Sequence, residues 1–205
     1  MGFTRWKLEL PPNGGGATTL QNAGGLWGAF TLGSYILGDN TLRADPNNTL
    51  FQHEYGHYLQ SQSYGFIYLP KFAIPSLYDA MRSSPSEHDY YKVEQDANAR
   101  ALSFFVGNYG NAFAKRTNEK GWNHDFNPIK NYNWSQDYNS VTNQSAIKNA
   151  KMGLTGLDIF GYALSFATFY TFPTYSIMSF PWYWAGAATV GSYGASAFGG
   201  GAIYY

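Results

Sequence analysis

The sequence predicts an α+β fold, in which a short β-hairpin is followed by two helices. Residues 26–42 carry aromatic and aliphatic side chains spaced by Gly and Thr, and this stretch contains a Gly-Asp-Asn turn signal near its end, which is typical of a hairpin or a pair of strands. Helix signals then place one helix over about residues 47–63 and a second over 93–106.

Both predicted helices are bounded by residues that favour helix ends. Asp45 can cap the first helix, Pro46 suits a first helical position, and Gly65 follows its last residues. Gly107 and Gly110 are expected to stop the second helix. Each helix is therefore expected to be a separate element.

The rest of the chain divides by composition. Residues 1–24 contain Pro-Pro and Gly-Gly-Gly and are expected to be irregular, whereas residues 25–151 form the expected domain. Within it, residues 66–75 are apolar and broken by two prolines, which favours a packed loop. Residues 152–205 form a tail rich in Gly and aromatic side chains, and its part 159–205 contains no charged residue or histidine.

The composition excludes some partners. Thirteen basic and thirteen acidic residues balance, so no net field attracts nucleic acid, and no nucleic-acid partner is expected. Charged residues make up only 13% of the chain and aromatic residues 19%, a texture that indicates a secreted or cell-surface protein. With no cysteine, a metal could be held only by histidines and carboxylates.

Neither end of the chain carries a clear membrane or export signal. Residues 1–20 lack the apolar core of a signal peptide, so export would require a longer chain or dedicated machinery. Windows in residues 159–205 are borderline for a membrane span, and their small and aromatic residues are compatible with membrane contact. A buried segment of a larger assembly is the alternative.

The strongest chemical signal is the segment His53-Glu54-Tyr55-Gly56-His57. Residues four apart on an α-helix lie on one face, so His53 and His57 can each direct a ring nitrogen at one ion. Glu54 lies beside that face, where it can take a proton from water activated by zinc. The pattern predicts a Zn²⁺ site with Glu54 as general base; the alternative is a pair of surface histidines.

A catalytic zinc site needs a third protein ligand. Gln and Ser occupy the two positions where the extended metzincin pattern has Gly and a third His. The second helix instead offers Glu94, on one face with Asn98 and two alanines that would allow the helices to approach closely. Asp96 and Arg100 are expected to pair on the outer side. The alternative for Glu94 is a solvated glutamate at a helix start.

With Glu94 included, the sequence resembles the gluzincins, the zincins whose third ligand is a Glu on a following helix. The resemblance implies a zincin-like fold with an active-site helix and a second ligand-bearing helix. It also implies that His53, His57 and Glu94 bind Zn²⁺ and that Asn98 orients a ligand histidine. The family commonly has Asp at the position of Asn98, so this chain offers an uncharged acceptor there.

Zincins commonly need one more donor, a His or a Tyr, to stabilise the oxyanion. His88, Tyr90 and Tyr91 precede the second helix, and His124 lies in a Trp-Asn-His-Asp-Phe loop. Each is a catalytic candidate, with an ordinary loop residue as the alternative, and His88 could also replace Glu94 as a ligand.

A rival interpretation takes the third ligand from the tail. Membrane-embedded site-2-type proteases pair such a helix with a Leu-Asp-Gly segment, which residues 157–159 match except that Ile replaces Gly. The Asp would be Asp158. Gln52, Gln60 and Gln62 give the first helix a water-facing context instead, which disfavours this interpretation.

The leading hypothesis is a zinc metallopeptidase acting on a peptide or protein. Segments Phe51–Pro75 and Val93–Ala101 also resemble metallopeptidase-like regions near the carboxyl ends of bacterial RHS-repeat proteins. This resemblance implies a toxin-like effector domain of a larger secreted bacterial protein as one alternative. A catalytically inactive zincin-like binding or structural module is the other.

Overall fold

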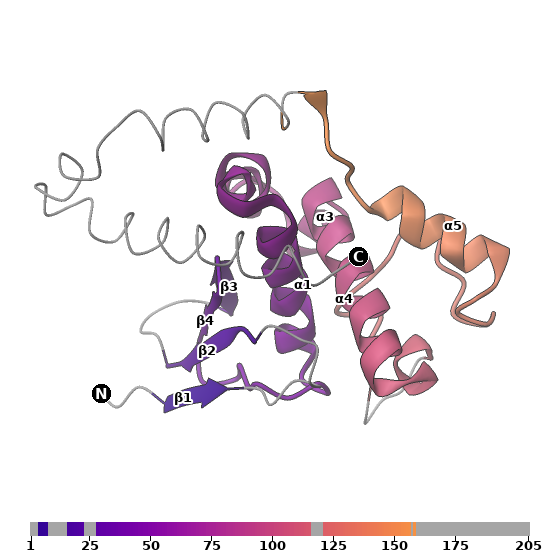
Figure 1. Cartoon of the computed structure of the whole chain (residues 1–205), viewed down its shortest axis with the longest axis horizontal. Helices are drawn as coiled ribbons and strands as arrows, with labels where there is room; N and C mark the ends of the chain where they lie inside the picture. Colours follow the sequence, from indigo (N-terminus) through magenta and orange to yellow (C-terminus); the bar gives the residue numbers. More distant parts are fainter. Residues whose placement is uncertain (1–3, 8–15, 23–27, 116–120, 157, 159–205) are drawn as a thin grey trace, which may run out of the picture.

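A long helix, α1 (Thr49–Tyr64), lies between a small β-sheet and a second long helix, α4 (Lys92–Tyr109), in the computed structural model of this chain (Figure 1). The structure describes residues 4–7, 16–22, 28–115, 121–156 and 158. Over these residues the predicted α+β class is confirmed.

The sheet is mixed and has the strand order β1-β2-β4-β3. Strands β3 (Ala29–Leu32) and β4 (Tyr35–Gly38) form the predicted hairpin, with Gly33 in the left-handed region at φ 63° between them. Strand β1 (Thr4–Lys7) pairs antiparallel with β2 (Thr18–Gln21), which pairs in parallel with β4. The expectation that residues 1–24 are irregular is therefore wrong for these two strands.

Helix α1 begins one turn later than the sequence signals suggest. Its N-cap is Asn48, whose side chain accepts a hydrogen bond from the Phe51 amide at 2.9 Å. The Asp45 carboxylate instead accepts from the Asn47 amide in the preceding turn, so Asp45 does not cap the helix. The predicted end is confirmed, because Gly65 closes the helix with φ 55°.

Residues 65–80 are helical, so the expected packed loop over 66–75 is wrong. A 3₁₀ turn η1 (Gly65–Ile67) leads into a π-helical turn η2 (Leu69–Ala73) and then into α2 (Ile74–Ala80). Pro70 and Pro75 each occupy one of the first two positions of their helical segments, where a missing N–H leaves no hydrogen bond unmade. The two prolines therefore start helical segments here.

Three shorter helices complete the described chain. They are α3 (Pro85–His88), η3 (Asn111–Ala114) and α5 (Val141–Ala150), whose N-cap Ser140 accepts from the Asn143 amide. The second predicted helix is confirmed as α4, which passes through Gly107 and ends at Gly110, with φ 92°.

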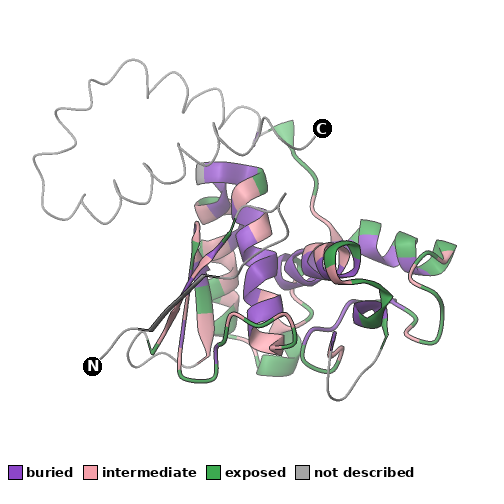
Figure 2. Cartoon of the chain, turned by 60° about the horizontal axis from the view of Figure 1, so that its bottom comes forward, coloured by how far each residue is buried: buried purple, intermediate pink, exposed green. Residues whose placement is uncertain are grey.

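The core lies where α1, α4 and the segment after α4 meet. Phe51, Tyr55, Phe105 and Trp122 are fully or almost fully buried there, and Figure 2 shows the buried positions concentrated on the two long helices. Among the described residues, none of the helices is both long and apolar enough to cross a membrane. The expected membrane contact concerns residues 159–205, which lie outside the described residues, and stays a prediction.

Candidate metal centre

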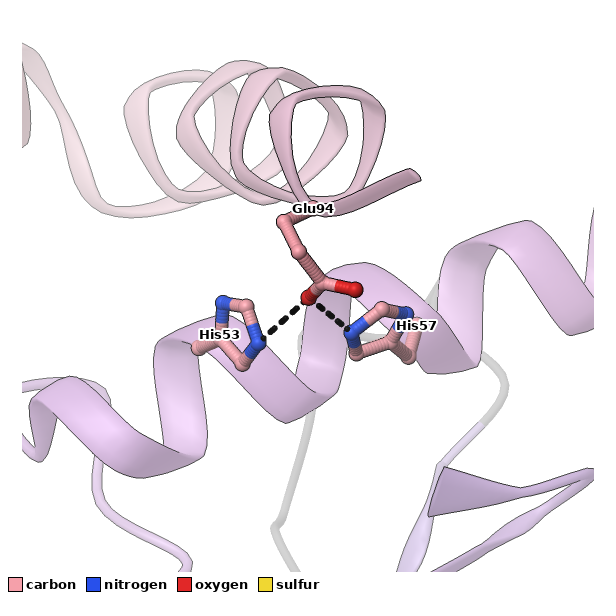
Figure 3. A group of neighbouring side chains, drawn as sticks. All are labelled: His53, His57 and Glu94. Carbon is pink, nitrogen blue, oxygen red and sulfur yellow. Dashed lines mark hydrogen bonds and ion pairs between the residues drawn. The ribbon is translucent and has the colours of Figure 1, made fainter. Parts of the chain in front are cut away.

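Three side chains from the two long helices converge on one point. His53 and His57 project from α1, and Glu94 projects from the first turn of α4 toward both rings (Figure 3). Glu94 Oε2 lies 2.9 Å from His57 Nε2 and 3.1 Å from His53 Nε2. The potential ligand atoms of these residues all lie within 4.8 Å of one another, so the group could hold a metal ion.

The group is buried on one side and partly open on the other. Glu94 is 1% exposed and His57 6%, whereas the His53 side chain is 20% exposed. A carboxylate removed from water in this way needs a cation or hydrogen-bond donors, because an unpaired buried charge is strongly destabilising. Access for an ion or a substrate is therefore on the His53 side.

Gly56 allows the two helices that carry these side chains to come this close. A Cβ atom at Gly56 would lie 2.2 Å from the carbonyl oxygen and 2.6 Å from the carbonyl carbon of Ala97 in α4. Only glycine fits such a backbone approach. The central Gly of the motif is therefore a packing residue between the two helices.

Each imidazole is held at Nδ1 by an amide side chain. His53 Nδ1 lies 2.9 Å from Asn98 Oδ1, and His57 Nδ1 lies 2.8 Å from Gln60 Oε1. The NH₂ groups of both amides donate to acceptors elsewhere, Asn98 to the Pro128 carbonyl and Gln60 to the Val93 carbonyl. The amide oxygens therefore face the rings, each Nδ1 carries a hydrogen, and each Nε2 is left to face Glu94.

Asp96 is buried, so the expectation that it pairs with Arg100 on the outer side is wrong in its placement. The pair itself forms, with Arg100 Nε 2.7 Å from Asp96 Oδ2. Asp96 is fully buried, and it also accepts hydrogen bonds from Gln60 Nε2 and from the Met152 amide. Asp96 thus fixes Gln60, which in turn fixes His57.

The charges of the site stabilise one another in the metal-free protein. Burial alone would lower the pKa of His53, but the hydrogen bond and charge of Glu94, with the charge of Glu54, raise this pKa to about 9. Burial would likewise lower the pKa of His57, but the charges of Glu94 and Glu54 outweigh it, so this pKa is also raised. Burial would raise the pKa of Glu94, yet the two imidazoles hold it well below its usual range.

The residues present fit a divalent metal ion. Glu94 Oε1 is buried and accepts no hydrogen bond from the described residues, although His88 Nε2 lies 3.7 Å away. Two imidazole nitrogens and a carboxylate are the donor set that Zn²⁺ takes in three-ligand protein sites. Such a site leaves a further coordination position for water or substrate.

Glu54 is buried beside the site, on the side of α1 that faces the sheet. The Thr31 hydroxyl on β3 donates to Glu54 Oε2 at 2.7 Å and also lies 2.9 Å from the Glu54 carbonyl oxygen. The charge of Glu54 raises the pKa of both imidazoles, so the carboxylate is within electrostatic range of them. Thr31, which positions Glu54, was not predicted from the sequence.

His88 lies near the other oxygen of the Glu94 carboxylate. Its Nε2 lies 3.7 Å from Glu94 Oε1, and its Nδ1 lies 2.8 Å from Asp79 Oδ2. Asp79 on α2 was also not predicted, because its separation from His88 in sequence gives no sign of the contact. The structure places Glu94, rather than His88, between the two motif histidines.

His124 and Asp158 are occupied elsewhere. The His124 ring stacks on Trp134 at 4.8 Å, and His124 Nδ1 lies 2.9 Å from Asp125. Asp158 forms an ion pair with Lys71 and accepts from Thr155, so the rival interpretation that makes it a metal ligand is wrong. Within the described residues, neither belongs to the group that could hold a metal.

No family model, curated protein or solved structure matches this chain. The structure supports a buried group of His53, His57 and Glu94 that could hold a metal ion.

The pKa of His53 predicts how the stability of the metal-free protein depends on pH. Below pH 6.5, the ordinary pKa of histidine, His53 is charged in both the folded and the unfolded chain, so the stabilisation from its attraction to Glu94 is fully present. This stabilisation is lost as the pH rises through about 9, the pKa of His53 in the folded chain. The free energy of unfolding should fall by up to about 3 kcal/mol over this interval. Urea denaturation at a series of pH values, with a chelator present to keep the protein metal-free, measures this free energy.

A His53→Gln variant is the control, because it removes the titrating group. Its metal-free stability should change less over the same pH interval than that of the wild type. A wild-type stability that stays level or rises between pH 6.5 and 9.5 would contradict the prediction.

Proposed function

We propose that this protein is a zinc-dependent hydrolase, most specifically a gluzincin-like metallopeptidase acting on a peptide or protein. The observation that supports it is the convergence of His53, His57 and Glu94 from two helices, with a buried carboxylate oxygen that accepts no hydrogen bond from the described residues. A bound zinc ion would supply Lewis acidity and bring the pKa of water close to neutrality.

In this proposal the residues of the chain have distinct tasks. His53, His57 and Glu94 hold the ion, and Asn98 and Gln60 keep the two imidazoles oriented. Glu54 acts as the general base, held by Thr31 and able to receive the proton of the attacking water. Its burial keeps this proton from bulk solvent.

The pair of His88 and Asp79 is suited to the developing oxyanion. Asp79 accepts from His88 Nδ1 and so leaves Nε2 directed toward Glu94 and the space beside it. An imidazole held in this way donates from Nε2 when protonated, which would stabilise negative charge on a tetrahedral intermediate. His124 is the weaker candidate for this task, because it is stacked on Trp134 and paired with Asp125.

The second candidate is a metal-binding module without turnover. Its support is the Thr31 hydroxyl, which engages one oxygen of the Glu54 carboxylate, since a carboxylate in this contact can also be a purely structural group. In either case we propose a secreted or cell-surface setting without nucleic acid, and residence in a larger chain of the RHS-repeat kind.

Zinc content and peptide cleavage, measured on the same samples, test the proposal. We expect the wild type to hold one zinc ion per chain by elemental analysis and to cleave members of a broad peptide library followed by mass spectrometry. Glu54→Gln should keep the zinc and lose turnover by roughly a hundredfold or more, because the general base is removed while the ligands remain.

Glu87→Gln is the matched control, since it makes the same chemical change on an exposed helix cap where Gln can also accept the hydrogen bond from Ser84. Its zinc content and turnover should equal those of the wild type. A Glu54→Gln variant with wild-type turnover would contradict the catalytic role. A wild type that holds zinc and cleaves nothing would establish the binding module instead.

A further inference from the structure

A cavity of about 550 Å³ is linked to the metal centre through hydrogen bonds of α4. It is lined by two segments: α3 and the residues after it, including Asp89 and Tyr90, and the loop that carries His124, Lys130 and Trp134. A cavity of this size can hold a side chain or a chain terminus of a peptide.

Helix α4 connects this cavity to the metal ligands. Asn98, which contacts His53, donates to the carbonyl of Pro128 in the cavity wall. Gln95 donates to the carbonyls of both Asp89 and Pro128 and accepts from the Lys130 amide at 2.6 Å. The two lining segments are thus fastened to the helix that carries Glu94, so the cavity is preformed and linked to the site.

The Asp89 carboxylate is the charged group of this cavity on which the inference rests. Its side chain is half-buried and makes no hydrogen bond or ion pair with the residues that the structure describes. Burial raises the pKa of Asp89, the charges of His53 and His88 only partly offset this rise, and the charge of Glu94 adds to it; Asp89 is therefore within electrostatic range of the metal centre. A half-buried carboxylate gains most from a cationic donor.

Aromatic rings line the same cavity. Tyr132 and Trp134 pack at 4.4 Å between ring centroids, His124 stacks on Trp134, and Tyr90 is exposed on the other lining segment. Ring faces attract ammonium and guanidinium groups, and a planar guanidinium also stacks on them.

Of the charged side chains that line the cavity, Asp89 is the one that has neither a counter-ion among the described residues nor full solvation. Asp125 is exposed and paired with His124. Lys130 is exposed, so water can solvate its ammonium group, and it makes no ion pair within the described chain. A cation that enters would meet Asp89 and the rings, with Lys130 at the solvent side.

We propose that this cavity binds a cationic group of the substrate, an ammonium or guanidinium, through Asp89 and the surrounding rings. The inference deepens the proposed function, because the cavity would then set which peptides the metal centre receives. The cation could be an Arg or Lys side chain or the free amino terminus of a peptide.

Peptide binding, rather than cleavage, tests this inference. The full chain carrying Glu54→Gln is titrated with short peptides that bear a fluorophore at a carboxyl-terminal cysteine, and binding is followed by anisotropy. Arg is placed at each position in turn and compared with citrulline, its uncharged counterpart, and each peptide is made with a free and an acetylated amino end. We expect Arg or the free amino end to tighten binding by roughly tenfold, the strength of one charge-assisted hydrogen bond.

Asp89→Asn should abolish this preference, and its metal content should remain that of the parent, because the Asp89 side chain makes no hydrogen bond or ion pair with the described residues. Asp125→Asn, on the same cavity, should keep the preference. Equal binding of all charged and uncharged peptides would overturn the inference, as would a preference that survives Asp89→Asn. Absence of cleavage by the wild type bears only on the proposed function, since binding is measured independently.

Discussion

We expect Glu94→Ala to weaken zinc binding by roughly several hundredfold, because a protein zinc ligand contributes on the order of 3–4 kcal/mol. Glu94 is central to the group: its Oε2 contacts both imidazoles, and its Oε1 is buried and accepts no hydrogen bond from the described residues. The measurement is competition with a chromophoric chelator, together with elemental analysis of the purified protein.

Two further variants make this result specific. Glu87→Gln changes a glutamate on the exposed cap of α3 and should leave zinc affinity unchanged. Asn98→Ala removes the hydrogen bond to His53 but no ligand, so we expect a smaller loss of about 10–100-fold. Full zinc occupancy in Glu94→Ala would move the third ligand to another group, and His88 is the first to test, because its Nε2 lies 3.7 Å from Glu94 Oε1.

The second large effect is expected from Gly56→Ala. The added methyl group would lie 2.2 Å from the Ala97 carbonyl oxygen, which belongs to the backbone of α4 and cannot move aside alone. The two helices must therefore move apart, which also increases the distance between His57 on α1 and Glu94 on α4. We expect the metal-free protein to lose about 3 kcal/mol of unfolding free energy or more, as overpacked cores do, and zinc affinity to fall as well.

Gly107→Ala provides the matched control for this substitution. Gly107 lies inside α4, and nothing approaches within 4 Å of the position of its Cβ atom. Alanine should therefore stabilise the protein by up to about 1 kcal/mol through helix propensity. Urea denaturation of both variants measures the contrast, and a Gly56→Ala protein as stable as Gly107→Ala would mean that the helices are not in close contact at Gly56.

The sequence predicted those parts of the site that depend on local periodicity. His53 and His57 are four apart on a helix with clear end signals, and Glu94 lies near the start of a second helix with equally clear signals. Helical spacing alone determines which of these side chains share a face. The contact of Asn98 with a motif histidine was also expected, although from a resemblance rather than from spacing.

The parts that the sequence could not predict depend on contacts between distant segments. Thr31 reaches Glu54 from a strand, and Asp79 reaches His88 from α2, a helix for which the sequence carries no clear signal. The sequence predicted Asp96 on the solvent-facing side of its helix, because helix spacing indicates the pairing with Arg100 but does not show which other segments bury the pair. The strands before residue 25 were missed because a four-residue strand gains its stability from its neighbours, and β2 pairs in parallel with β4.

The hydrogen bonds at His53 Nδ1 and His57 Nδ1 also bear on how fast the protein can take up metal. Both rings are already fixed by Asn98 and Gln60, so neither has to search among rotamers when an ion arrives. The loss of side-chain freedom has occurred during folding, and metal uptake adds little to it. The rate of uptake should then be governed by the departure of protons from Nε2 and of water from the ion, as in a rigid synthetic chelator.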